Sequence, residues 1–387
     1  MHIYNHLRRS ILARIVLAII LGITMGTVLP IWIVRLFVTF NDIFSEFLGF
    51  SIPLIIVGLV TPSICEIGTK ARNLLLTTVA LAYGSTIIAG LGSYAISSIS
   101  FPYFIEQMSA IDDIATKTDI APYFTVDIPP LMNVMTALIL AFVMGLGISY
   151  IKGSTLKAVA IDFRDIITGT IESVIIPLLP IYIFGIFMNM TAKGEVFGIL
   201  SVFIKIIGII FAMHIVWLLL LFLIGGSIGR RNPLKALVTM MPAYFTALGT
   251  QSSAATIPVT LKQTVKNGVR DEIAGFVIPL CATIHLSGSM LKIVACAIAL
   301  MIMKGDAIVL SQFVGFICLL GVTMVAAPGV PGGAIMAALG ILHSSLGFDA
   351  SDQALMITLY ITMDSFGTAC NVTGDGAIAL VVNKVAK

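Results

Sequence analysis

The sequence predicts an all-α polytopic membrane protein with eight transmembrane helices and two re-entrant helical hairpins. Three observations lead to this prediction. Hydrophobic residues make up 58% of the 387 residues and charged residues 11%, against about 45–50% and about 25% in soluble domains. Several apolar stretches approach the roughly 20 residues that cross a bilayer. Two further apolar segments are interrupted by polar residues or by proline and glycine. Non-helical backbone within a membrane is stable only where protein or water satisfies its hydrogen-bonding groups.

Six candidate spans come first and form a domain over 1–232, at 10–30, 44–64, 73–99, 130–151, 166–190 and 195–227. The basic and then apolar start lacks a small-residue cleavage site, so we expect an uncleaved first span. Lysine and arginine concentrate on alternate connections, whereas the 100–128 connection is acidic. Because basic loops stay in the cytoplasm, we expect both termini there.

The charge and the cysteines exclude several classes of protein. The net charge of +3 follows membrane topology, so we predict no nucleic-acid partner. The five cysteines lie in or beside apolar segments without any C-x-x-C spacing. We therefore expect buried free thiols and neither a disulfide framework nor a zinc site.

A second domain, 233–387, begins with the first interrupted segment, 233–268. The polar stretch TQSSAATIPVT lies at 250–260, between the basic sequences GRRNPLK and KQTVKNGVR. Both ends favour the cytoplasm, so we expect a segment that enters the membrane and returns. We expect a non-helical polar tip that lines a site, with Pro258 starting the returning arm.

The second interrupted segment is 308–344, where the sequence APGVPGGAIM carries two prolines and three glycines. A span at 271–303 separates the two hairpins, and a last span follows at 353–383. Corresponding interruptions in two such segments indicate a transporter's binding site near the middle of the membrane. Its glycines allow close backbone approach and a hinge, as a gate requires.

The last span carries a polar stripe. Asp364, Thr368, Asn371 and Asp375 fall within about a 60° arc of one helix, at about 100° per residue. Two carboxylates, an amide and a hydroxyl suit a hard cation or an ammonium group. The alternative is polar contact between helices.

The preceding span carries His285, Ser287, Ser289 and Lys292. His285 is either a proton carrier or a hydrogen-bonded structural histidine. Lys292 is either paired with an aspartate inside the protein or directed toward the membrane surface along its flexible stem. Ionisable residues at membrane depth are functional candidates by default.

Three motifs together resemble the dicarboxylate/amino acid:cation symporter family, which includes the excitatory glutamate transporters and bacterial serine/threonine symporters. QSSAATIP is similar to the family's first hairpin tip, PGVPGGAIM to its second tip, and TACNVTGD to its T-x-x-N-x-x-G-D motif. The resemblance implies a homotrimer in the lipid bilayer of a bacterial inner membrane. It also implies a scaffold from the early spans and a transport unit that moves in an elevator mechanism.

The resemblance also implies roles for single residues. Asp364 matches the ligand of the substrate amino group, and Asn371 and Asp375 match sodium ligands, with Asp375 the principal carboxylate. Further substrate contacts match Ser252, Ser253, Val330, Pro331, Gly332, Thr368 and Asn371. Thr86 and Ser287 fall near positions of additional sodium ligands.

Two departures from the family pattern bear on the substrate and the ion. Members that carry acidic substrates have an arginine where this chain has Gly367, so an extra carboxylate would be buried unpaired. This predicts a neutral substrate, unless Gln251 or Lys292 compensates. The family's N-M-D-G-T is HLSGS here, at 285–289. At least one sodium site is therefore expected to be altered, with His285 or Lys292 as coupling candidates that stand in for the ion.

These features predict a secondary active symporter of small neutral amino acids such as serine, threonine or alanine, and not an enzyme. The alternative is a symporter of dicarboxylates or of acidic amino acids. The coupling ion is expected to be Na⁺ or H⁺, without an organic cofactor. An ion channel would favour rings of carbonyls, and an intramembrane hydrolase pairing Ser253 with His285 lacks a supporting motif.

Overall fold

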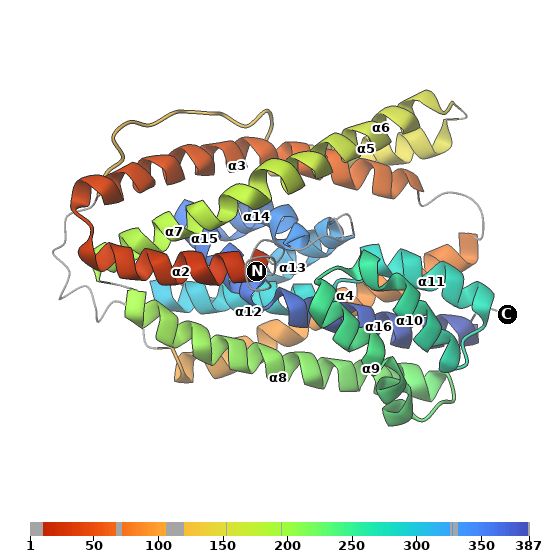
Figure 1. Ribbon diagram of the computed structural model, residues 1–387. Helices are drawn as coiled ribbons and strands as arrows, with labels where there is room; N and C mark the ends of the chain where they lie inside the picture. The colour runs from red at the N-terminus through yellow and green to blue at the C-terminus, as the bar shows by residue number, and fades with distance from the viewer. Residues whose placement is uncertain are drawn as a thin grey trace, which may run out of the picture.

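The computed structural model describes residues 11–66, 72–105, 120–151, 153–194, 196–325, 327 and 332–385. Within these ranges the chain is helical and contains no β-strand (Figure 1). The α-helices within residues 1–232 are α2 (Ile11–Val28), α3 (Ile31–Glu66), α4 (Arg72–Ser100), α5 (Val134–Tyr150), α6 (Thr155–Thr170), α7 (Ile176–Lys193) and α8 (Val196–Ile228). Those within residues 233–387 are α9 (Pro233–Thr250), α10 (Ser253–Lys266), α11 (Asp271–Ile284), α12 (Ser287–Lys304), α13 (Leu310–Met324), α14 (Gly333–Leu346), α15 (Ala350–Thr362) and α16 (Asp364–Val385).

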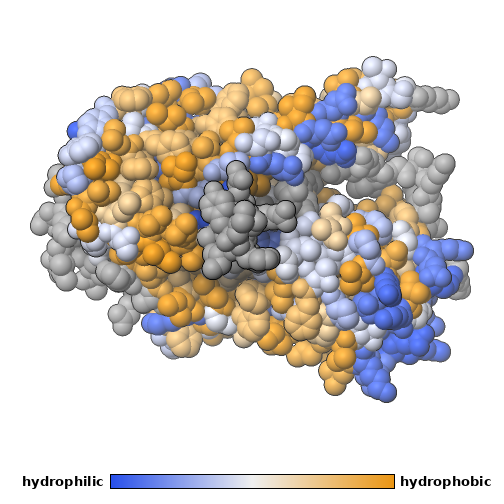
Figure 2. Space-filling view, in the orientation of Figure 1, coloured by the Kyte–Doolittle hydropathy of each residue, from blue (hydrophilic) through white to orange (hydrophobic). Residues whose placement is uncertain are grey.

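Several helical segments suit a membrane. In the described part of the chain, five are long and apolar enough to cross one: Ile31–Pro62, Leu74–Tyr103, Thr155–Lys193, Val202–Ile228 and Asp271–Lys304. Figure 2 shows hydrophobic side chains over the face of α2, α7 and α8, while hydrophilic ones gather at the end where α9, α10 and α11 lie. Such a surface belongs to an integral membrane protein. The number of eight spans remains a prediction.

Two of the early spans begin sooner than predicted. Helix α3 starts at Ile31 and not at 44, so Arg35 lies in a helix and not in a loop. Its Nε donates to the carbonyl of Ala121 at 2.9 Å, and its guanidinium lies 4.4 Å from the ring centre of Tyr123. The fifth span starts at Thr155 and not at 166, because α6 continues through a π-helical turn, η3 (Ile171–Ile175), into α7.

The first hairpin is formed by α9 and α10, and its tip is shorter than predicted. Only Gln251 and Ser252 interrupt the helices, with Gln251 at φ 53°. The side chain of Ser252 accepts from the backbone N–H of Ala255 and starts the returning arm. Thr256 supports this turn because its hydroxyl donates to the carbonyl of Ser252 at 2.8 Å. The prediction that Pro258 begins this arm is wrong, since it lies inside α10.

Each of the two spans predicted within residues 233–387 is divided into two helices. The span predicted at 271–303 breaks at His285 and Leu286, between α11 and α12. The span predicted at 353–383 breaks at Met363, between α15 and α16. Helix α16 lies at the centre and packs against α8, α9, α10, α11 and α12. The residues expected on its polar stripe all belong to α16, so the shared face survives the break.

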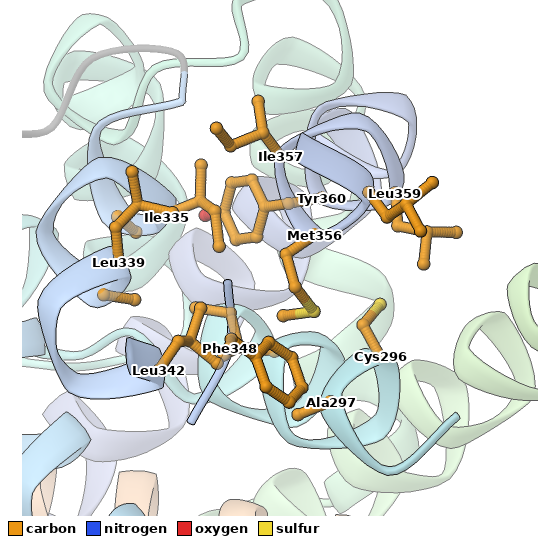
Figure 3. Packing of buried hydrophobic residues seen from close by; sticks show 14 of the residues in the cluster. Cys296, Ala297, Ile335, Leu339, Leu342, Phe348, Met356, Ile357, Leu359 and Tyr360 are labelled. Atoms are coloured by element: carbon orange, nitrogen blue, oxygen red, sulfur yellow. The ribbon is translucent and has the colours of Figure 1, made fainter. Parts of the chain in front are cut away.

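The second hairpin consists of α13 and α14. Gly332 precedes α14 with φ 75°, a conformation that favours glycine. Val330 and Pro331, predicted to contact substrate, lie outside the described residues. Figure 3 shows Ile335, Leu339 and Leu342 of α14 packed near Met356 and Tyr360 of α15, so the returning arm rests on a hydrophobic core.

Four of the five cysteines are buried as free thiols, as expected: Cys65, Cys281, Cys296 and Cys370. The expectation is wrong for Cys318, which is exposed on α13. Burial there follows the face of the helix and not the apolar character of the segment.

The close contact of α12 with α16 depends on Gly288. A Cβ at this position would lie 2.7 Å from the Cβ of Cys370 and 2.7 Å from the carbonyl oxygen of Gly367. We therefore expect Gly288→Ala to lower the free energy of unfolding by about 1–3 kcal/mol, the usual cost of overpacking. Thermal unfolding in detergent measures this. Gly275→Ala is the control, because no atom lies within 4 Å of a Cβ there; equal effects of the two substitutions would contradict the packing argument.

Candidate solute-binding site

The tips of both hairpins contact the first two residues of α16. From the first tip, Nε2 of Gln251 donates to Oγ of Ser365 at 2.8 Å. From the second, the backbone N–H of Gly332 donates to Oδ2 of Asp364 at 2.8 Å. The first tip is 114 residues and the second tip 32 residues from its partner in the sequence, and both therefore meet at one point of α16.

The other oxygen of Asp364 is bound by Lys292. The Nζ–Oδ1 distance is 2.8 Å, and the two side chains are 0% and 4% exposed. The ammonium also lies 3.4 Å from the ring centre of Tyr360, within the range of a cation–π contact. Lys292 thus pairs inside the protein and does not reach toward the membrane surface.

Lys292 occupies the space beside Gly367. A Cβ on residue 367 would lie 2.7 Å from Nζ and 2.8 Å from Cε of Lys292. Gly367 is therefore adjacent to the Lys292 ammonium, a cation supplied by α12. This is the position where acidic-substrate members of the family that the motifs resemble carry an arginine.

Asn371 connects α16 to the start of α12. Its Oδ1 accepts from the backbone N–H groups of Gly288 at 2.7 Å and of Ser289 at 3.3 Å. Its Nδ2 donates to Oγ of Ser289 at 3.1 Å, and that oxygen lies 3.0 Å from the hydroxyl of Tyr360. The amide satisfies N–H groups that the helix start leaves free.

Asp375 lies in a second buried cluster, deeper along α16. Its Oδ1 is 2.8 Å from Nδ1 of His285, whose Nε2 is 3.0 Å from Oγ of Ser85. His285, at 1% exposure, and Asp375, also at 1%, are both closed off from the surface. The histidine thus bridges α4 and α16 at the break between α11 and α12.

These side chains do not fit a sodium ion in this arrangement. The oxygen of Asn371 faces two N–H groups, and Oδ1 of Asp375 faces an imidazole nitrogen. Thr86 donates its hydroxyl to the carbonyl of Ala82 at 2.8 Å. Ser287 has a buried hydroxyl with no partner among the described residues. Sodium needs several oxygens directed to one point, and this set does not supply them.

The predicted residues therefore form two groups. Gly332, Asp364, Gly367 and Lys292 converge at the hairpin tips, together with Gln251. Ser253, at 6% exposure, begins α10, and Thr368, also at 6%, is buried on α16. Asp375 and His285 form the separate, deeper group.

Sequence reasoning missed two residues of these groups, Tyr360 and His214. Tyr360 lies under the Lys292 ammonium, and Nε2 of His214 on α8 lies 3.0 Å from the carbonyl oxygen of Gly288. Ser289, named from the sequence, links Asn371 to Tyr360. Helical spacing gives no reliable signal for Tyr360, because α15 ends between Tyr360 and Asp364. His214 is an ionisable residue within an apolar span, which is itself a signal.

Comparison with known proteins places this geometry in a family. The sodium:dicarboxylate symporter family matches residues 11–385, which is nearly the whole chain. The chain belongs to the sodium:dicarboxylate symporter family. The resemblance seen in the three motifs is thereby confirmed, and so is the prediction that this is not an enzyme, since the family consists of symporters.

Individual members of the family are similar over part of their length. Excitatory amino acid transporter 2 of Homo sapiens is 28% identical over 262 residues, which cover 66% of this chain and 45% of that protein. Excitatory amino acid transporter 3 of Mus musculus is 30% identical over 266 residues, which cover 66% of this chain and 49% of that protein. This sodium:dicarboxylate symporter family member therefore spans about half of the length of these relatives.

Proposed function

We propose that this protein is a secondary active symporter, which moves a small neutral amino acid such as serine, threonine or alanine across a membrane together with a cation. One observation carries the proposal: both re-entrant tips bind consecutive residues of α16, Ser365 and Asp364, in the interior. Opening one tip or the other would expose the same carboxylate to opposite sides of a membrane. A site between two such tips suits alternating access, and in the proposed elevator it moves with the transport core.

The neutral substrate is supported by the balance of charge at the tips. Asp364 and Lys292 form one pair, so they add no net charge to the site. Gly367 supplies no cation of its own. The ammonium and carboxylate of a neutral amino acid also sum to zero, and no charge is then buried without a partner.

A dicarboxylate or an acidic amino acid is the second candidate, and the position of Lys292 favours it. Its Nζ lies 2.7 Å from where the Cβ of residue 367 would be. Lys292 is therefore able to supply an anion contact from α12 where the resembled acidic-substrate carriers use an arginine. The names of the relatives, excitatory amino acid transporters, agree with this candidate as well.

The proposed roles follow the two groups of residues. Ser252, Ser253, Gly332, Asp364, Gly367 and Thr368 line the solute site, to which Val330 and Pro331 are assigned by the motif alone. The coupling cation is Na⁺ or H⁺. The family's name supports sodium, whereas the arrangement around Asp375 opposes it. His285 and Lys292 are the coupling candidates, because each brings a nitrogen to a buried carboxylate.

The proposed assembly is that of an elevator. Residues 1–232 provide a scaffold and part of the transport unit, and residues 233–387 provide the transport core. Eight spans and two hairpins place both termini in the cytoplasm of a bacterial cell. The exposed hydrophobic side chains of the early helices, such as Ile139 and Ile204, suit lipid and the neighbouring copies of a homotrimer.

Uptake by proteoliposomes tests the function. Labelled L-serine, L-threonine, L-alanine, L-aspartate, L-glutamate and succinate are offered under a Na⁺ gradient and, separately, under a pH gradient. We expect concentrative uptake of a neutral amino acid with at least one gradient. Uptake of the acidic solutes alone would select the second candidate, and uptake that never exceeds the outside concentration would exclude symport.

The His285–Asp375 contact yields a separate prediction about the ion. We expect His285→Asn to make uptake more dependent on Na⁺, because the imidazole no longer occupies Oδ1 of Asp375 and the amide adds an oxygen. Uptake is measured against Na⁺ concentration. The control is His343→Asn. His343 lies in the last turn of α14, and its Nδ1 is 2.9 Å from the carbonyl oxygen of Phe348, just after that helix. A sodium response that is the same in both variants and in the unmodified protein would contradict the prediction.

A further inference from the structure

We infer that the Lys292–Asp364 ion pair opens to admit the solute, and that a zwitterion inserts between the two charges. In the loaded site the solute ammonium binds Asp364, and Lys292 transfers to the solute carboxylate. This inference rests on the proposed function and names the chemical class of its substrate. Each of the four charges keeps an opposite partner before and after binding.

The contacts of Asp364 determine which of its oxygens changes partner. Oδ2 accepts from the backbone of Gly332 at 2.8 Å and so stays bound to the second hairpin. Oδ1 accepts from the side chain of Lys292 at 2.8 Å, and the hydroxyl of Tyr360 also bonds this carboxyl group. Oδ1 is therefore the oxygen that a solute ammonium takes while the hairpin tip remains in place.

Lys292 has a route for this exchange. Its long stem runs beside Gly367, where the absence of a side chain leaves room for the methylene groups. The face of the Tyr360 ring, 3.4 Å from Nζ, offers the ammonium a favourable surface that does not depend on Asp364. The ammonium is thus stabilised by a second contact while its ionic partner changes.

The exchange defines the substrate class by its two charges. An acid without an ammonium leaves Lys292 or Asp364 without its partner, and an amine without a carboxylate does the same. Since an unpaired buried charge is costly, both classes are excluded. The inference therefore requires α-amino acids and rejects the matching hydroxy acids and amino acid amides.

Three solutes of similar shape test this with the full chain in detergent. L-Alanine is a zwitterion, L-lactate lacks the ammonium, and L-alaninamide lacks the carboxylate; L-serine, L-glycerate and L-serinamide form a second series. Binding is measured by the shift of thermal unfolding with solute concentration. We expect at least one zwitterion to bind. Its two analogues are expected to bind at least on the order of 30-fold more weakly.

Two variants reverse the preference. Lys292→Met leaves one net negative charge, so the amide is expected to bind better than the hydroxy acid. Asp364→Asn leaves one net positive charge, so the hydroxy acid is expected to bind better than the amide. The double variant carries neither charge and is expected to favour neither analogue. A merely structural ion pair would weaken all three solutes together.

The outcomes separate the inference from the proposed function. Equal binding of zwitterion and hydroxy acid to the unmodified protein overturns the inference, whether or not the variants fold. So does the absence of binding by both zwitterions, or a variant that keeps the original order of preference. If no solute is concentrated in proteoliposomes, the proposed function itself fails.

Discussion

Replacing Lys292 by methionine is expected to lower the free energy of unfolding by about 3–5 kcal/mol, and replacing Asp364 by asparagine to do the same. Each substitution leaves a buried charge without its partner, which costs this much. The two side chains are 0% and 4% exposed. The double variant, with both charges removed, is expected to recover most of the loss. Unfolding in detergent, followed by heat or by denaturant, provides the four measurements of the cycle.

An exposed pair supplies the control for this experiment. Lys304 and Asp306 are 3.8 Å apart, with side chains 40% and 46% exposed. Exposed pairs contribute about 0–1 kcal/mol, so Asp306→Asn is expected to change little. If the single variants at Lys292 and Asp364 were no less stable than Asp306→Asn, the buried ion pair would not exist as described.

Introducing an arginine at Gly367 is expected to reduce uptake at least about a hundredfold, equivalent to about 2.7 kcal/mol. Its Cβ would lie 2.7 Å from Nζ of Lys292, so the new side chain meets an existing cation in the same space. Combined with Lys292→Met, the arginine restores one cation beside Asp364. We expect this double variant to regain uptake and to accept L-aspartate. Proteoliposome uptake of L-aspartate and L-alanine measures both effects.

Gly367→Ala separates size from charge in this experiment. Its Cβ has the same short distance to Lys292 but carries no cation, and the end of a lysine side chain can shift. We expect Gly367→Ala to reduce uptake less than Gly367→Arg does. Adding Lys292→Met to Gly367→Ala is not expected to restore uptake. Equal losses for alanine and arginine would mean that space alone decides, and the electrostatic account of position 367 would be wrong.

The hairpins were predictable because their signals are local. Basic residues flank both ends of 233–268 around a polar stretch, and this pattern predicts the turn that separates α9 from α10. The stripe from Asp364 to Asp375 was predictable from helical periodicity, since the break before Asp364 leaves all four residues on α16. Family motifs then identified the tips that meet there.

The breaks within spans were not predictable from pattern. Leu286 lies between His285 and Ser287, and Met363 lies between Thr362 and Asp364, with no proline at either break. The sequence offers two signals for the start of α10, Ser252 and Pro258. The Ser252 side chain caps the helix, and Pro258 lies inside it. Arg35, which the early start of α3 places in a helix, has its partners at residues 121–123, far along the chain.

The partners of the buried ionisable side chains could not be predicted from the sequence either. Spacing placed His285 and Lys292 seven residues apart, but a break follows His285, so their contacts diverge. His285 bonds Asp375, and Lys292 bonds Asp364. Only the fold decides which carboxylate each nitrogen meets, and this assignment separates the solute site from the deeper cluster.

The meeting of the first hairpin tip with α16 is tested most directly by a disulfide cross-link. Gln251→Cys and Ser365→Cys are combined in a background whose five native cysteines are serine, and oxidation is followed by proteolytic mapping. The control pair combines Gln251→Cys with Asp165→Cys. Asp165 lies on α6, which packs against α3 and not against the first hairpin tip. We expect rapid cross-linking of the first pair and arrest of uptake until the bond is reduced. Cross-linking no faster than in the control would contradict the placement of the tip at α16 and the solute site built on it.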